Sequence, residues 1–174
     1  MSSTLRDTTQ IALLLAVGTV LRIIMPGYGA GMKPDVALAM LFIIIVMKPQ
    51  FRTVIIAGII AGILAALTTS FPGGQIPNIV DKPITAMFAL GMVTLLKNRI
   101  PDAAIATLLG AVATVFSGTM FMLVALLFVG LPAAFGVLFT TVVLPAAVMN
   151  TISVLVLYPV IKFSKNVVES TQRV

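Results

Sequence analysis

The chain has 174 residues, of which 60% are hydrophobic and 9% are charged, and its formal net charge is +6. A soluble domain carries about 25% charged residues, so this composition predicts a single domain, residues 1–174, embedded in lipid. The sequence contains no Cys and no His, which removes disulfides and the usual zinc or haem ligands, and no cofactor or metal is expected. No basic cluster with interleaved aromatic residues accompanies the positive charge, so nucleic acid is not an expected partner.

Six apolar segments follow one another along the chain and predict an all-α protein with six transmembrane helices. They cover residues 9–25, 35–47, 53–69, 83–96, 102–129 and 135–163. No small-residue cleavage site ends the first segment, so we expect it to be a retained helix. Because a span needs about 20 residues, the second and fourth segments are expected to be short.

The basic residues predict the orientation of these helices. With the N-terminus inside, eight of the eleven Lys and Arg residues fall on the inner side, and Arg22, Lys33 and Lys82 fall on the outer side. The positive-inside rule therefore places both termini in the cytoplasm, whereas the opposite orientation would expose eight positive charges outside. Arg22, near the end of the first segment, is expected to extend to the outer interface.

Each of the two short segments begins with Lys–Pro and an adjacent Asp, in "MKPDVALAM" (32–40) and "VDKPITAMF" (80–88). Proline suits the first turn of a helix, and Asp complements the helix dipole there. An apolar run of about 13 residues covers about 20 Å of a hydrocarbon layer about 30 Å thick. The two starts are thus predicted to lie below the outer surface, at the floor of a transporter-like cavity. The alternative is two ordinary helix starts at the interface.

Two lysines, two helix N-termini and two aspartates in one cavity would suit a zwitterion, and an amino acid with an apolar or aromatic side chain is the simplest one. The alternative is that each Lys only neutralises the Asp beside it. Asn150, near the middle of the last segment and five residues after Pro145, is either a ligand contact or a hydrogen-bonding group between helices. The candidate substrate-binding residues are Lys82, Asp81, Asn78, Gln75, Lys33, Asp35, Tyr28, Met32, Phe71, Phe88 and Asn150.

Small residues recur at a spacing of four in two of the segments. Gly58 and Gly62 form a GxxxG pattern, which allows helices to approach closely and is expected to serve internal packing. Ala12 and Ala16 form a similar pair in the first segment, and packing is the default expectation for them too. Motifs such as GxxxxGK[ST], GxSxG and HExxH are absent, so the sequence does not predict an enzyme or an ATPase.

The stretches "GMKPD" (31–35) and "LTTSFPGGQIPNIVDKPIT" (67–85) resemble the bacterial tryptophan transporter family. That family is related to the substrate-binding S-components of energy-coupling factor (ECF) vitamin transporters. The resemblance implies a multi-pass protein of the bacterial cell membrane that captures L-tryptophan at the outer face, with the first outer loop as a gate. Ala12 and Ala16 match the AxxxA of helix one that contacts the coupling subunit in S-components, so this subunit and two ATPases are the implied partners.

The resemblance also suggests a role for each candidate residue. Lys82, with Lys33, would bind the carboxylate, and Asp81, Asp35 or backbone carbonyls of residues 70–83 would bind the ammonium. Gln75, Asn78 or Asn150 would accept the indole N–H, and Phe71, Phe88, Tyr28 and Met32 would pack against the rings. The alternatives are a solitary or homo-oligomeric carrier, an S-component for another aromatic or vitamin substrate, and a membrane protein without a small ligand.

Overall fold

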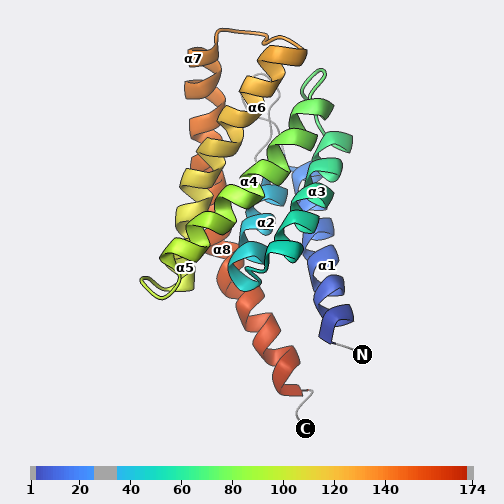
Figure 1. The fold of residues 1–174 in the computed structure, drawn as a ribbon, viewed down its shortest axis with the longest axis vertical. Coiled ribbons are helices and arrows are strands. Elements are labelled where there is room, and N and C mark those ends of the chain that lie inside the picture. The colour runs from blue at the N-terminus through green and yellow to red at the C-terminus, as the bar shows by residue number, and fades with distance from the viewer. Residues whose placement is uncertain (1–2, 26–34, 172–174) are drawn as a thin grey trace.

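The structure, a computed structural model, describes residues 3–25 and 35–171, and all regular structure within these ranges is helical (Figure 1). The first four helices are α1 (Ser3–Ile24), α2 (Val36–Met47), α3 (Phe51–Leu67) and α4 (Gln75–Leu96). The fifth segment is continuous through α5 (Asp102–Leu108), the π-helical turn η1 (Leu109–Ala113) and α6 (Thr114–Phe128). The sixth runs through α7 (Phe135–Leu138), the π-helical turn η2 (Phe139–Val143) and α8 (Leu144–Thr171).

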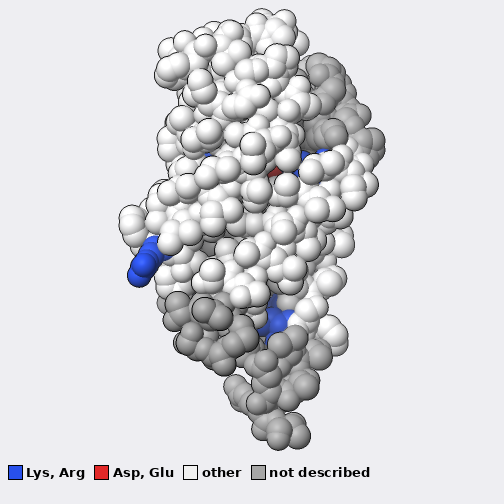
Figure 2. Space-filling view, turned by 90° about the vertical axis from the view of Figure 1, so that its right-hand side faces the viewer, with Lys and Arg blue, Asp and Glu red and all other residues white. Residues whose placement is uncertain are grey.

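Three of these segments are long and apolar enough to cross a membrane: Gln75–Leu96, Asp102–Phe128 and Phe135–Asn166. Three shorter apolar helices accompany them: Thr8–Ile24, Val36–Met47 and Phe51–Leu67. The six segments agree with the six predicted from the sequence. Apolar side chains cover much of the surface, and Figure 2 shows a face with few charges, some of them recessed among uncharged side chains.

Helix α2 is the centre of the bundle. It contacts α1, α3, α4, α5 and α8, and every residue from Val36 to Val46 is buried. A helix that is apolar on all sides is stable only where other elements surround it, which is the position α2 occupies. Its 12 residues cover about 18 Å, so the prediction that the second segment is short is confirmed.

Helix α4 differs from the prediction, because it begins at Gln75 rather than near Pro83. Its 22 residues cover about 33 Å, and Pro83 lies inside the helix. Pro77 lies in the first turn of this helix, one residue before the first helical donor, the Asn78 N–H bonded to the Gly74 carbonyl. A proline in that first turn gives up no helical hydrogen bond. The prediction of a short fourth segment that starts at Lys82 and Pro83 is therefore wrong.

The glycines of α3 bring α3 against α4. A Cβ added to Gly58 would lie 2.8 Å from the Ala86 Cβ and 3.1 Å from the Pro83 Cα, and one added to Gly62 would lie 3.2 Å from the Asn78 carbonyl oxygen. The GxxxG pattern thus serves packing within the chain, as predicted. The contact also fixes the stretch of α4 that carries Asn78, Asp81 and Lys82.

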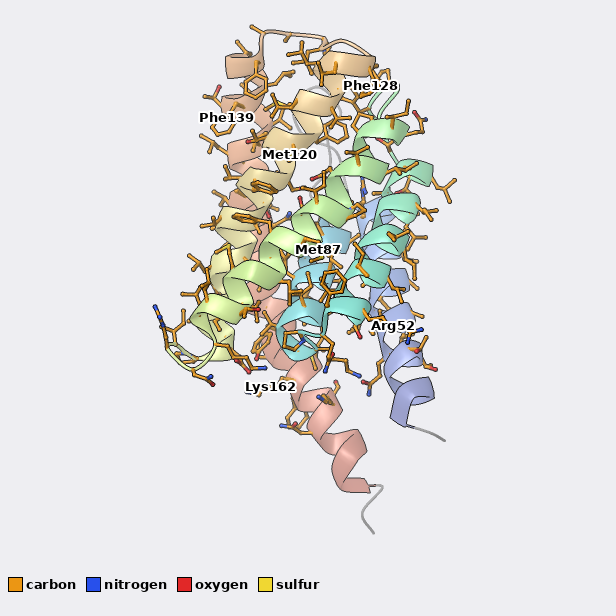
Figure 3. All side chains as sticks on the ribbon, viewed as in Figure 1. Arg52, Met87, Met120, Phe128, Phe139 and Lys162 are labelled. Atoms are coloured by element: carbon orange, nitrogen blue, oxygen red, sulfur yellow. The ribbon has the colours of Figure 1, made fainter. Side chains whose placement is uncertain are left out.

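The two ends of the bundle differ in charge. Helix α1 begins and α8 ends at the same end, and the α2–α3 and α4–α5 connections lie there too (Figure 1). Figure 3 shows Arg52 and Lys162 toward this end and Phe128 at the opposite one. The connections at this end also carry Lys48, Lys97 and Arg99.

Candidate functional site

A cavity of about 140 Å³ is lined in part by the α3–α4 connection, which lies at the end of the bundle opposite the basic end (Figure 1). Its walls come from α1, the start of α2, the α3–α4 connection, α4, α6, α7, η2 and α8. The polar residues that line it are Arg22, Asp35, Thr69, Ser70, Asn78, Asp81, Lys82, Thr114, Ser117 and Asn150. A cavity of about 150 Å³ in a protein core can hold one benzene ring.

Lys82 lies at the centre of an ion network beside this cavity. Its Nζ is 2.8 Å from Asp81 Oδ2 and 3.0 Å from Asp35 Oδ2. It also donates to Ser117 Oγ at 3.3 Å. The network therefore joins α4 to α6 and to the start of α2, and it places Asp35, Asp81 and Lys82 together as the sequence predicted.

Asp81 is completely buried and holds hydrogen bonds on both carboxylate oxygens. Thr85 Oγ1 donates to Oδ1 at 2.7 Å. Ser117 Oγ donates to Oδ2 at 2.7 Å, and Lys82 donates to the same oxygen. A buried charge needs such partners, because an unpaired ion is costly away from water.

Arg22 also belongs to this network, contrary to the expectation that it extends to the outer interface. It lines the cavity, its side chain is 12% exposed, and its Nη1 lies 3.6 Å from Asp35 Oδ1. Asp35 is the N-cap of α2, where its Oδ1 accepts from the Leu38 N–H at 3.2 Å. The prediction was wrong because a carboxylate at the start of a neighbouring helix attracts the guanidinium inward. Arg22, Lys82, Asp35 and Asp81 together balance to zero formal charge.

Asn150 lies on α8, across the cavity from α4, and is completely buried. Its Nδ2 donates to Thr114 Oγ1 at 3.2 Å. Its Oδ1 has no hydrogen-bond partner among the residues that the structure describes. Nδ2 connects α8 to α6, as the interpretation of a hydrogen-bonding group between helices predicts. Oδ1 remains an open acceptor, so contact with a ligand stays a prediction.

Part of the cavity wall is aromatic and apolar. Phe71 and Phe121 line it and meet edge to face, with ring centroids 5.3 Å apart. Met122, Leu138, Val142 and Val143 extend this wall. Asn78 also lines the cavity, and its Nδ2 donates to the Gly74 carbonyl at 2.7 Å.

Two of the predicted residues lie elsewhere. Gln75 is exposed at the start of α4 and does not line the cavity. Phe88 stacks on Phe116, with ring centroids 4.1 Å apart, and packs against the main core instead. Gln75 was expected in a loop and Phe88 near a helix start at Pro83, whereas α4 begins eight residues earlier, at Gln75. Tyr28, Met32 and Lys33 lie outside the described residues.

Several lining residues were not in the predicted set of binding residues: Thr114 and Ser117 were only weaker candidates, because Ser and Thr can bond to their own helix, and Phe121 was not a candidate. Thr114, Ser117 and Phe121 share one face of the fifth segment and all line the cavity. Their spacing of three and four residues is that of a helical face, so it is the signal that could have found them together. Nothing in the sequence marks Arg22 as a cavity residue, since its partner Asp35 belongs to another helix.

The sequence is similar to those of known proteins. The family described as tryptophan transporter TrpP matches residues 4–166. A protein named "Probable tryptophan transport protein" in Bacillus subtilis (strain 168) is 45% identical over 157 residues, covering 90% of this chain and 91% of the relative. Proteins of the same name in Clostridium acetobutylicum and Clostridium perfringens are 45% identical over 157 residues and 42% identical over 162 residues. They cover 90% and 88% of this chain, and 92% and 89% of their own lengths.

No solved structure matches the chain. The family match and the membrane-capable helices identify a multi-pass protein of a bacterial membrane with a role in transport rather than catalysis. The chain belongs to the tryptophan transporter TrpP family.

Proposed function

We propose that the protein binds L-tryptophan from the outer side of the bacterial cell membrane and delivers it to the cytoplasm. The observation that carries the proposal is the composition of the cavity. An ion network of Arg22, Asp35 and Lys82 lines it, together with the aromatic side chains of Phe71 and Phe121 and with Asn150, whose Oδ1 is an open acceptor among the described residues. The family and the names of the relatives support tryptophan as the substrate.

The chemistry of tryptophan suits the charged, aromatic and amide side chains that line this cavity. Its carboxylate and ammonium would meet the charged residues, and its indole ring would pack against Phe71 and Phe121, which already meet edge to face. An indole N–H is a donor without acceptor capacity, and Asn150 Oδ1 is an acceptor without a donor among the described residues. We therefore assign the indole N–H to Asn150 rather than to Gln75 or Asn78. Gln75 does not line the cavity. Asn78 lines it, but the buried acceptor without a partner among the described residues is Asn150 Oδ1.

The charge distribution supports capture from outside. The basic connections at one end of the bundle are those that the positive-inside rule places in the cytoplasm. The cavity lies toward the opposite end, where the α3–α4 connection contributes Thr69, Ser70 and Phe71. With both termini inside, this end faces outward and the cavity is accessible to external solute.

The energy source would be an ECF coupling subunit with two ATPases, in the manner of an S-component. Ala12 and Ala16 are exposed on α1, beside the exposed Leu13, Val17 and Val20. They do not pack within the chain, so this stripe is open to a helix of another subunit, since small residues allow close approach. A solitary secondary carrier is the second candidate. In that case the chain itself would have to change conformation during transport.

Uptake of labelled L-tryptophan separates these possibilities. The chain would be expressed in cells that lack their own tryptophan carriers, with and without an ECF coupling module, and its amount in the membrane would be measured. Uptake only with the module is the expected result, and Ala12→Leu with Ala16→Leu should abolish it. The matched control is Ala104→Leu on the exposed start of α5. Uptake without the module would favour the solitary carrier, and no uptake in either case would contradict the proposed function.

A further inference from the structure

We propose that the substrate zwitterion inserts between Arg22 and Asp35 and replaces their mutual contact, while the Lys82–Asp81 pair stays bonded as a fixed support. Arg22 would bind the carboxylate, and Asp35 would bind the ammonium. This inference rests on the proposed function, and it moves the carboxylate from Lys82, where the sequence placed it, to Arg22.

Lys82 has no donor left for a new anion. An ammonium has three N–H groups, and Lys82 directs its own toward Asp81 Oδ2, Asp35 Oδ2 and Ser117 Oγ at 2.8, 3.0 and 3.3 Å. Its side chain is 6% exposed. Binding of a substrate carboxylate here would break contacts that connect three helices.

Asp81 likewise has both carboxylate oxygens occupied by hydrogen bonds. Its two oxygens accept hydrogen bonds from Thr85, Ser117 and Lys82, each within 2.8 Å. Its side chain has no exposed surface. A substrate ammonium would have to displace one of these donors, so Asp81 is a poor first partner for it.

Arg22, unlike Lys82 and Asp81, has a polar atom that forms no hydrogen bond with the described residues. Its Nη1 is buried without a hydrogen-bond partner among the described residues. The Asp35 oxygen at 3.6 Å is too distant for a hydrogen bond, although the charges still attract each other. A guanidinium presents several donors in one plane and binds a carboxylate through two parallel hydrogen bonds. Arg22 therefore offers the donors that Lys82 lacks.

Asp35 has the capacity that Asp81 lacks. Oδ1 accepts one hydrogen bond, from the Leu38 N–H at 3.2 Å, and Oδ2 accepts one from Lys82 at 3.0 Å. Each carboxylate oxygen can accept about two. The side chain is also the most exposed of the ion network, at 17%. An ammonium can thus bind Asp35 without displacing Lys82.

The exchange explains why both charges of the substrate would be needed. Opening the Arg22–Asp35 contact leaves two opposite charges in a poorly solvated cavity. A zwitterion compensates both residues at once, whereas a ligand with one charged group leaves the buried ion network with one uncompensated charge, which is costly. Discrimination between an amino acid and its amine or acid analogue would follow from this contact.

Purified wild-type protein and three ligands test the proposal: L-tryptophan, tryptamine without the carboxylate, and indole-3-propionate without the ammonium. The chain has no Trp, so indole fluorescence reports each ligand directly. Both analogues are expected to bind about 10- to 100-fold more weakly than L-tryptophan, as the loss of a charge-assisted hydrogen bond predicts. Analogue binding equal to that of tryptophan would overturn the inference without any substitution.

Substitutions then assign each end of the ligand. Arg22→Gln is expected to weaken L-tryptophan about 10- to 100-fold and to leave tryptamine unchanged, and Asp35→Asn should spare indole-3-propionate in the same way. Arg99→Gln, exposed in the α4–α5 connection, is the matched control. Unchanged tryptophan binding in folded Arg22→Gln would overturn the inference and leave the proposed function intact. Absence of tryptophan binding to the wild type would remove both.

Discussion

Lys82 and Asp81 are consecutive residues of α4, yet their side chains form an ion pair, with Nζ 2.8 Å from Oδ2. Adjacent residues of a helix do not face each other, so the long lysine side chain must turn back toward its neighbour. Ser117 on α6 bonds to both members of the pair. The pair is therefore a junction between α4 and α6 as well as a local neutralisation.

This junction predicts a pattern of stability. Asp81→Asn and Lys82→Met each leave the buried ion network with one uncompensated charge, and each should lower the free energy of unfolding by about 3–5 kcal/mol, the cost of breaking a buried ion pair. The double variant removes both charges and should be more stable than either single variant. Thermal unfolding in detergent measures this. Additive losses in the double variant would contradict the coupling.

Asn150 should recognise the indole N–H. Asn150→Leu removes the acceptor and is expected to weaken L-tryptophan about tenfold, as the loss of one buried hydrogen bond predicts. 1-Methyltryptophan, which has no indole N–H, should bind the wild type weakly and lose little more in the variant. Calorimetric titration of both ligands checks this, with Thr114→Val as a control for the Nδ2 contact. Equal losses for the two ligands would show that Asn150 acts on packing alone.

Gly58 and Gly91 form a matched pair of helical glycines. A Cβ at Gly58 would lie 2.8 Å from the Ala86 Cβ, whereas a Cβ at Gly91 would meet nothing within 4 Å. Gly58→Ala should therefore lower stability by about 1–3 kcal/mol through overpacking between α3 and α4. Gly91→Ala should be neutral or raise stability by up to about 1 kcal/mol. Melting temperatures in one detergent compare them, and a stable Gly58→Ala would refute the close approach.

Phe71 belongs to the cavity wall and Phe88 packs against the core, so substitutions at the two positions should have different effects. Phe71→Leu changes the cavity wall, where Phe71 meets Phe121, and should weaken tryptophan by several-fold, about the worth of one aromatic contact. Phe88→Leu breaks the stack with Phe116 outside the cavity, so it should lower stability and leave affinity unchanged. Fluorescence titration with a parallel melting curve distinguishes the two effects. A loss of affinity in Phe88→Leu alone would reverse this assignment.

The sequence predicted the number of helices and the position of α2, because apolar length and periodicity are local properties. It did not predict where α4 begins. Lys82–Pro83 carries the same local signal as a true helix start, but α4 begins at Gln75 and continues through Pro83, in the stretch on which α3 packs.

The candidate site was also predicted only in part. Asp35, Asp81, Lys82, Asn78, Phe71 and Asn150 line one cavity, since polar residues in a lipid-embedded chain gather where they can satisfy one another. The role of Arg22 could not be predicted, because it depends on a carboxylate that is thirteen positions away in sequence and 3.6 Å away in space. The pairing that leaves Lys82 occupied and Arg22 Nη1 open likewise depends on residues of four helices, α1, α2, α4 and α6.

The most direct test of the account is the fluorescence of L-tryptophan added to the purified wild-type protein, which has no indole of its own. Binding in the cavity should shift the emission to the blue in a saturable way, and tryptamine at the same concentration should compete poorly. A spectrum that stays that of tryptophan in water at every protein concentration, with no heat of binding by calorimetry, would contradict it.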